Sequence, residues 1–242
     1  MKIGFISDIH ANLEALEVVL QDIKFRKITE IWCLGDIVGY GANPNECIDL
    51  IRSNNIICVM GNHELATTVD SDSNDFNPYA DDGISWTRSV ITKENRAYIA
   101  KLPLKLELGN FTLVHGSPKE PFDYITTLKE AEQAIPYVKT TFCLIGHSHI
   151  PMVATFKDEK HKKIRHVNNQ GRIALFNSTA FINPGSVGQP RDENPESSYM
   201  IYDSDTNSVM NRRIKYAISM ARQKIIDAGL PKWLGDRLFE GR

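Results

Sequence analysis

Short apolar runs alternate with helix-spaced segments over the first 64 residues of the chain. Residues 3–6, 30–34 and 56–60 are largely apolar runs of the length expected for buried strands. Between them, apolar residues recur every three or four positions in residues 13–27, which predicts a helix, and a second helix is expected over residues 45–52. The order strand, helix, strand, helix, strand is typical of a parallel sheet with crossover helices.

The pattern becomes strand-rich after residue 100. Residues 104–114 alternate apolar and polar positions around a glycine-containing turn, which predicts a β-hairpin. Residues 141–145 form another apolar run, and six shorter strand-like segments follow between residues 152 and 214. Because short strands joined by turns usually pair antiparallel, we expect them to form a second, largely antiparallel sheet.

Nothing in the sequence divides the chain, since it contains no repeat, low-complexity tract or linker. We therefore expect a single domain over residues 1–242, with a C-terminal helical tail over residues 215–242. The acidic stretch 65–82 is predicted to be a solvated loop above the functional site, and the region 65–92 is a candidate lid. A second cation site is the alternative, but the stretch lacks calcium-loop spacing. A helix is expected over residues 84–100, with a break near residue 92.

The composition narrows the classes of function. A net charge of −2 gives no basic field for nucleic acid or for a membrane surface. No apolar run approaches the length of a membrane span, and a strand at the very start leaves no room for a signal peptide. The four cysteines form no C-x-x-C pair, so we expect buried free thiols. These features predict a cytoplasmic protein, and they leave its oligomeric state open.

Carboxylate, imidazole and amide side chains follow the predicted buried strands. The carboxyl ends of parallel strands meet at one edge of a sheet, and ligands of α/β proteins bind there. An aspartate that caps the next helix, with an incidental histidine, is the alternative explanation for Asp8 and His10 taken alone. The convergence of several strand ends favours a metal site. The candidate ligands are Asp8, His10, Asp36, Asn62, His115, His147 and His149.

The chemistry of this set suits a pair of metal ions. Mixed oxygen and imidazole ligands favour manganese, iron, zinc or nickel over an ion that prefers thiolates. Seven ligands exceed what one ion needs, and they suit two ions if one carboxylate bridges them. Two ions about 3.5–4 Å apart can stabilise the attacking and leaving oxygens of phosphoryl transfer together. The sequence therefore predicts a binuclear centre in which a bridging water is the nucleophile.

Five motifs carry a resemblance to the calcineurin-like metallophosphoesterase family, and in particular to its small bacterial members. They are Asp8-x-His10, Gly35-Asp36-x-x-x-x-Gly41, Gly61-Asn62-His63-Glu64, His115-Gly116 and Gly146-His147-x-His149. Residues 183–191 and 228–238 also resemble family segments, the first of them near the site. The resemblance implies an α/β (α+β) fold, a four-layer sandwich of two packed mixed β-sheets flanked by helices. Ala11 departs from the pattern, because glycine is frequent there.

The resemblance also implies how the ligands are shared between the two ions, with Asp36 as the bridge. Mn²⁺ is the expected ion, and Fe, Zn and Ni are the alternatives. One ion would be held by Asp8, His10, Asp36 and His149, and the other by Asp36, Asn62, His115 and His147.

His63 is implied to remain off the metals, to contact the phosphate and to protonate or orient the leaving group. Glu64 or another carboxylate would orient it. Asn62, His63 and Arg191 are the predicted substrate contacts, and a surface arginine is the alternative for Arg191. Asn12 is interpreted as a helix cap rather than a substrate contact.

The predicted function is metal-dependent hydrolysis of a phosphate ester, by a phosphodiesterase or a phosphomonoesterase, with His63 and Asp36 as catalytic residues. A protein serine/threonine phosphatase and a dinucleoside-polyphosphate hydrolase remain alternatives. An inactive binding scaffold would be signalled by lost ligands or a lost His63, and none is lost. The substrate is expected to be a small phosphate ester or nucleotide, and the motifs leave its identity open because it depends on the loops around the site.

Overall fold

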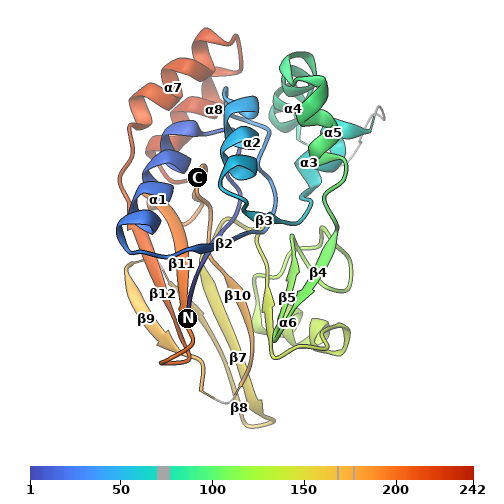
Figure 1. The fold of residues 1–242 in the computed structure, drawn as a ribbon, viewed down its shortest axis with the longest axis vertical. Coiled ribbons are helices and arrows are strands. Elements are labelled where there is room, and N and C mark those ends of the chain that lie inside the picture. Colours follow the sequence, from blue (N-terminus) through green and yellow to red (C-terminus); the bar gives the residue numbers. More distant parts are fainter. Residues whose placement is uncertain (70–76, 168, 177) are drawn as a thin grey trace.

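Two six-stranded sheets form the centre of the molecule (Figure 1). The structure is a computed structural model and describes residues 1–69, 77–167, 169–176 and 178–242. We call them sheet A and sheet B. In spatial order, sheet A contains β3 (Ile57–Cys58), β2 (Glu30–Cys33), β1 (Lys2–Ile6), β11 (Ser197–Asp203), β12 (Ser208–Ile214) and β9 (Gly171–Ala174). The three N-terminal strands are parallel, as expected, and β11 pairs antiparallel with β1.

Sheet B is also mixed. In spatial order it contains β4 (Lys105–Leu108), β5 (Phe111–Val114), β6 (Phe142–Leu144), β10 (Thr179–Asn183), β7 (Met152–Asp158) and β8 (His161–His166). The predicted hairpin is β4 and β5, with Leu106 opposite Leu113. β6 lies between β5 and β10 and is parallel to both. The predicted class, an α/β fold of two mixed sheets flanked by helices, is confirmed.

The expected division of strands between the sheets was wrong. Of the six later strands assigned to an antiparallel sheet, β9, β11 and β12 belong to sheet A, where β11 extends the parallel strands beside β1. Sheet B takes the hairpin and β6 instead, so it contains parallel pairs. Alternation along a strand reports which of its faces is buried, and it does not identify the distant strand that completes the hydrogen bonding.

Helices cover the outer faces of both sheets. α1 begins after Asn12, whose side chain accepts a hydrogen bond from the Ala15 N–H, so the predicted cap is present. In Figure 1, α1, α2, α7 and α8 lie on one side of the upper part of the molecule and α3, α4 and α5 on the other. The helices are α1 (Leu13–Phe25), α2 (Pro44–Ser53), α3 (Asn62–Thr68), α4 (Pro78–Val90), α5 (Lys93–Ile99), α6 (Leu128–Ala134), α7 (Ile218–Asp227) and α8 (Lys232–Asp236), with short 3₁₀ turns η1 (Ile135–Tyr137) and η2 (Arg237–Phe239). None of the helices in the described residues is long and apolar enough to cross a membrane.

The main core lies between the two sheets. Phe5 of β1 stacks on Trp32 of β2, with ring centroids 5.6 Å apart, and meets Phe111 of sheet B edge-on. On the opposite face of sheet A, Ile6 packs in a second cluster with residues of α1 and α2 such as Leu16. Alternate residues of β1 thus face two cores, and packing on both faces fixes the position of the strand and of the loop that follows it.

The predicted loop over residues 65–82 is partly helical. α3 continues to Thr68, and α4 begins at Pro78, where Asn77 accepts from the Ala80 N–H and proline fits the first helical position. Residues 70–76 lie outside the described residues, so the lid stays a prediction. The helix expected over residues 84–100 is two helices, α4 and α5, with the break at Ile91 and Thr92.

Candidate metal centre

The seven candidate ligands come from the loops that follow strands of both sheets. Asp8 and His10 follow β1, Asp36 follows β2, and Asn62 opens α3 directly after β3. His115 follows β5 of sheet B, and His147 and His149 follow β6. All of them are buried except Asn62, which is half-buried. The carboxyl ends of the two sheets therefore supply one shared cluster.

The cluster contains two groups of side chains that share Asp36. The first group is Asp8, His10, Asp36 and His149, and the second group is Asp36, His115 and His147. Within each group, one potential ligand atom per residue lies within 4.8 Å of all the others. His10 Nε2 lies 3.6 Å and His115 Nε2 3.2 Å from the same oxygen, Asp36 Oδ2. This division coincides with the implied sharing of the ligands, with Asn62 to be added to the second group.

Backbone carbonyls set the orientation of three of the histidines. Nδ1 lies 3.1 Å from the Val38 carbonyl in His10, 2.7 Å from the Leu34 carbonyl in His115 and 2.6 Å from a loop carbonyl in His149. A carbonyl only accepts, so each of these imidazoles carries a proton on Nδ1 and turns Nε2 toward the cluster, where His10 and His149 offer the Nε2 lone pair. Second contacts of this kind are typical of metal-binding histidines.

Divalent ions fit this cluster because some of its donor atoms lack a hydrogen-bond partner among the described residues. His10 Nε2 and His149 Nε2 lie only 3.1 Å apart with no proton between them in the tautomers assigned above, an arrangement that a cation stabilises. Asp8 Oδ1 and Asn62 Oδ1 are buried and have no hydrogen-bond partner among the described residues. A buried oxygen without a donor costs free energy unless something else compensates it, and a metal ion does so.

Burial and the carboxylates set the charges of the cluster. Burial lowers the pKa of His10 and His149 well below the usual value, and that of His147 to about 3. Burial alone would lower the pKa of His115 as well, but attraction to Asp36 and the hydrogen bond that His115 donates to Asp36 outweigh burial and raise the value to about 10. Most of the imidazoles are thus neutral lone-pair donors around a negative centre, which is the state that metal ligation requires.

The backbone at the cluster is strained. Asp8, His10, Asp36, His147 and His149 have φ values of 53°, 50°, 53°, 64° and 61°, all in the left-handed region. Each such residue costs about 1–3 kcal/mol and persists only where the surroundings impose it. Strain at five members of one buried cluster is the kind of concentration found at functional sites. Ala11 also has a φ of 51°, so glycine would be the less strained residue at this position.

Two neighbouring residues hold Asp36 in place. Glu64 accepts hydrogen bonds at 2.7–3.1 Å from the backbone N–H groups of Asp36, Ile37, Val38 and Gly61. Gly61 itself is pressed against Asp36, since a Cβ there would lie 2.1 Å from Asp36 Oδ1. Glu64 was expected as one candidate for orienting His63, and its carboxylate instead organises the loop that presents Asp36.

Residues 183–191 donate hydrogen bonds to the loops that carry the candidate ligands. The sequence did not predict these hydrogen bonds. Asn183 donates to the Gly146 carbonyl at 2.7 Å, on the loop of His147 and His149. The Ser186 hydroxyl donates to the Asp8 carbonyl at 2.7 Å. The only sequence signal was the resemblance of this segment to a family segment, because contacts between residues 37 and 178 positions apart leave no local pattern.

A cavity of about 420 Å³ opens beside the cluster. Asn62, His63 and Arg191, the three predicted substrate contacts, all line it. His63 is buried, its Nε2 lies 4.0 Å from Asp36 Oδ2, and burial lowers its pKa to about 4. Arg191 donates to Gln189 at 2.9 Å, and its guanidinium carbon lies 5.9 Å from the ring centre of Tyr40.

Aromatic residues of the cavity were missed. The Tyr40 ring lies 4.8 Å from that of His10 and 4.7 Å from that of His63. Tyr40 stands inside the second motif and could have been noticed there, whereas Phe122 and Tyr124 come from a loop without any motif. The described residues that line the cavity are Asp36, Tyr40, Asn62, His63, Leu65, Ala66, Val69, Asn77, Phe122, Tyr124, His147, His149 and Arg191.

Comparison with known proteins places this site in a family. Residues 1–207 match the calcineurin-like phosphoesterase superfamily domain. The crystal structure of a metallophosphoesterase from Sphaerobacter thermophilus has a TM-score of 0.91 and 37% identity, with 100% of both chains covered. The chain therefore belongs to the calcineurin-like phosphoesterase superfamily, whose members include metal-dependent phosphoesterases.

Two further relatives match very different shares of the chain. An uncharacterized protein of Methanocaldococcus jannaschii is 43% identical over 247 residues, covering 99% of this chain and 98% of that protein. A symmetrical bis(5'-nucleosyl)-tetraphosphatase of Baumannia cicadellinicola is 34% identical over 68 residues, 27% of this chain and 24% of that one. The similarity to the tetraphosphatase thus concerns about a quarter of each chain.

Proposed function

We propose that the protein hydrolyses small phosphate esters, diesters or monoesters, with two divalent metal ions bound in the two groups that share Asp36. The observation that carries this proposal is the pairing of those groups across one carboxylate, with unpartnered oxygens facing inward. Bound ions would supply a nucleophilic water at neutral pH and would neutralise charge on the phosphate. Manganese suits the mixed oxygen and imidazole donors, and iron, zinc and nickel are the alternatives.

The ligand assignment follows the two groups. Asp8, His10 and His149 serve the first ion, and Asp36 serves both. Asn62, His115 and His147 serve the second ion. The proposal for Asn62 is supported by its buried, unpartnered Oδ1 and by its place beside Asp36 and His147 on the cavity wall.

His63 and Arg191 act on the phosphate in this proposal. His63 lies beside Asp36 and borders the cavity, so its imidazole can donate to the leaving oxygen. A bound phosphate would add negative charge next to His63 and so favour the protonated imidazole, which is the form that donates a proton to the leaving oxygen. Arg191 has a buried Nε without a hydrogen-bond partner among the described residues, and a phosphate oxygen would satisfy it.

One observation favours a more specific alternative. The similarity to a bis(5'-nucleosyl)-tetraphosphatase over 68 residues makes a dinucleoside polyphosphate a second candidate substrate. A protein phosphatase has no corresponding support, and a scaffold without activity would not need the complete set of strained, buried ligands.

The test compares His63→Ala with the wild-type protein on p-nitrophenyl phosphate and bis-p-nitrophenyl phosphate in the presence of Mn²⁺. We expect turnover of at least one ester by the wild type and a loss on the order of 10²–10⁴-fold in the variant, because one general acid contributes that much. Elemental analysis should find the same metal content in both proteins.

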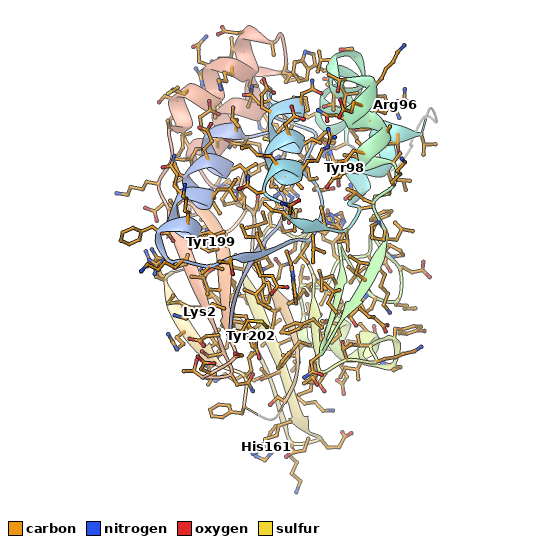
Figure 2. The ribbon with its side chains drawn as sticks, viewed as in Figure 1. Lys2, Arg96, Tyr98, His161, Tyr199 and Tyr202 are labelled. Carbon is orange, nitrogen blue, oxygen red and sulfur yellow. The ribbon has the colours of Figure 1, made fainter. Side chains whose placement is uncertain are left out.

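The matched control is His161→Ala, which removes an exposed imidazole at the tip of the β7–β8 hairpin, at the opposite end of the molecule from α4 and α7 (Figure 2). It should retain full turnover. No turnover of either ester by metal-loaded wild-type protein would refute the proposed function, and one metal fewer in His63→Ala would show that His63 is a ligand instead.

A further inference from the structure

The cavity lining combines two kinds of chemistry. Arg191 and His149 are polar, and Tyr40 lies against His10 of the first group. Phe122, Tyr124, Leu65 and Val69 add aromatic and apolar side chains to the same lining. Because a phosphate is bound by the metals and by cationic and polar groups, these apolar side chains have no role in binding the phosphate itself. They are available to the organic part of the ester.

The loop that carries the aromatic residues is built tightly against the centre. The Gly116 N–H donates to the Pro121 carbonyl at 2.7 Å, so the chain after His115 folds back on itself. A Cβ on Gly116 would lie 2.6 Å from the Asp123 carbonyl oxygen and 2.7 Å from that of Pro121, so only glycine permits this approach. The fold-back places Phe122 edge-on to His115, with ring centroids 6.3 Å apart.

Tyr124 is stacked on the second group and is still open to solvent. Its ring lies parallel to that of His147, with centroids 4.1 Å apart and planes inclined by 20°. His147 directs Nδ1 toward the cluster, where it lies 3.2 Å from His115 Nε2. Tyr124 therefore stacks on a ring that carries a predicted ligand atom. Although one face is covered, the residue remains 52% exposed. A half-exposed aromatic ring beside a candidate metal site is a surface on which another planar ring can stack.

We propose that Tyr124, backed by Phe122, is a stacking platform that makes the enzyme selective for phosphate esters of nucleosides, the base lying on the Tyr124 ring while the phosphate lies at the metals. This inference rests on the proposed function and adds the substrate class. Stacking on an aromatic side chain tolerates any base, because every base has a π face. A platform of this kind predicts that an ester with a nucleobase binds more tightly than the same ester without one. The identity of the base should have little effect on the affinity.

The test measures binding of AMP and of ribose 5-phosphate, which carry the same phosphate on the same sugar carbon and differ by the base. Dissociation constants are determined by calorimetry with Mn²⁺-loaded protein in the His63→Ala background, where hydrolysis is slow. We expect AMP to bind roughly 5- to 100-fold more tightly, the range for one stacked base. Tyr124→Ala should bring this ratio close to one, and Tyr124→Phe, which keeps the ring, should preserve it.

Tyr137→Ala is the control, since Tyr137 is also an exposed tyrosine but does not line the cavity. It should leave the ratio unchanged. Because the ratio compares two ligands on one protein, a loss of metal in Tyr124→Ala would affect both ligands and would not imitate the result. A ratio near one when Tyr124 is intact, or a ratio that survives Tyr124→Ala, overturns the platform. Turnover of bis-p-nitrophenyl phosphate tests the proposed function separately, so the failure of one is distinguishable from the failure of the other.

Discussion

The two groups of the metal centre share a carboxylate but differ in charge and in surroundings. The first group has two carboxylates, Asp8 and Asp36, and is buried beside Arg191. The second group has Asp36 as its single carboxylate, and the neutral, half-buried Asn62 is its proposed fourth member. It also adjoins the open side of the cavity at Tyr124.

Because of this difference, the two groups need not bind their ions with the same affinity. More negative ligand charge and a more rigid site increase the affinity for a divalent ion. We therefore expect the first group to bind its ion more tightly, and the second group to exchange its ion more readily and to contact the substrate. The predictions below test this asymmetry from the largest expected effect to the smallest.

The largest effect is expected from Asp36→Asn, because this residue belongs to both groups. The amide keeps the size of the side chain but removes the shared charge, so both ions should bind more weakly. Each ion contributes several kcal/mol to catalysis, and the combined loss of turnover should be on the order of 10⁴-fold or more. Elemental analysis and turnover of bis-p-nitrophenyl phosphate measure the two effects. Retention of two tightly bound ions would contradict the bridging assignment.

A matched pair of substitutions separates the groups. His147 and His149 lie two residues apart on one loop, both with positive φ, and belong to different groups. Calorimetric titration with Mn²⁺ should resolve a tighter and a weaker site in the wild type. His149→Ala should weaken the tighter constant and His147→Ala the weaker one, each by at least about 100-fold, since even supporting contacts contribute 10–100-fold. The opposite pattern would reverse the asymmetry.

Metal removal should produce the smallest of the three effects, a change in stability. Ions present at about 100 times the dissociation constant stabilise the folded state by ~2.7 kcal/mol per site. For a chain of this length, ~2.7 kcal/mol corresponds to a decrease of roughly 5–10 °C in melting temperature when a chelator removes one ion. The melting temperature, measured at stepwise Mn²⁺ concentrations, should rise in two phases, and the first phase should occur at the lower concentration. A single phase would indicate equivalent sites, and no change at all would argue against metal binding.

Much of the centre could be predicted because the relevant signals are local. An apolar run followed at once by Asp8 or by Asp36 places a side chain at the end of a strand, whatever that strand pairs with. The parallel order of the first three strands follows from the intervening helices. The motif sequence then restricts the family, and the family implies the fold that the structure confirms.

Other features could not be predicted, since they depend on contacts between distant segments. The pairing of β11 with β1, in which Lys2 lies opposite Asp203, joins strands that are far apart in the sequence and has no local signature. The hydrogen bond from Ser186 to the Asp8 carbonyl spans 178 residues. The stacking of Tyr124 on His147 depends on how one loop folds back over Gly116.

The sequence by itself identified the candidate ligands, because strand ends and motif spacing are properties of short segments. Only the tertiary structure decided how the strands divide between sheets A and B and how residues 183–191 support the loops of the candidate ligands. It also decided which aromatic side chains line the cavity. The physical reason is the same in each case: burial and hydrogen bonding are satisfied by whichever segments meet in space, and a local pattern states the need for a partner without identifying it.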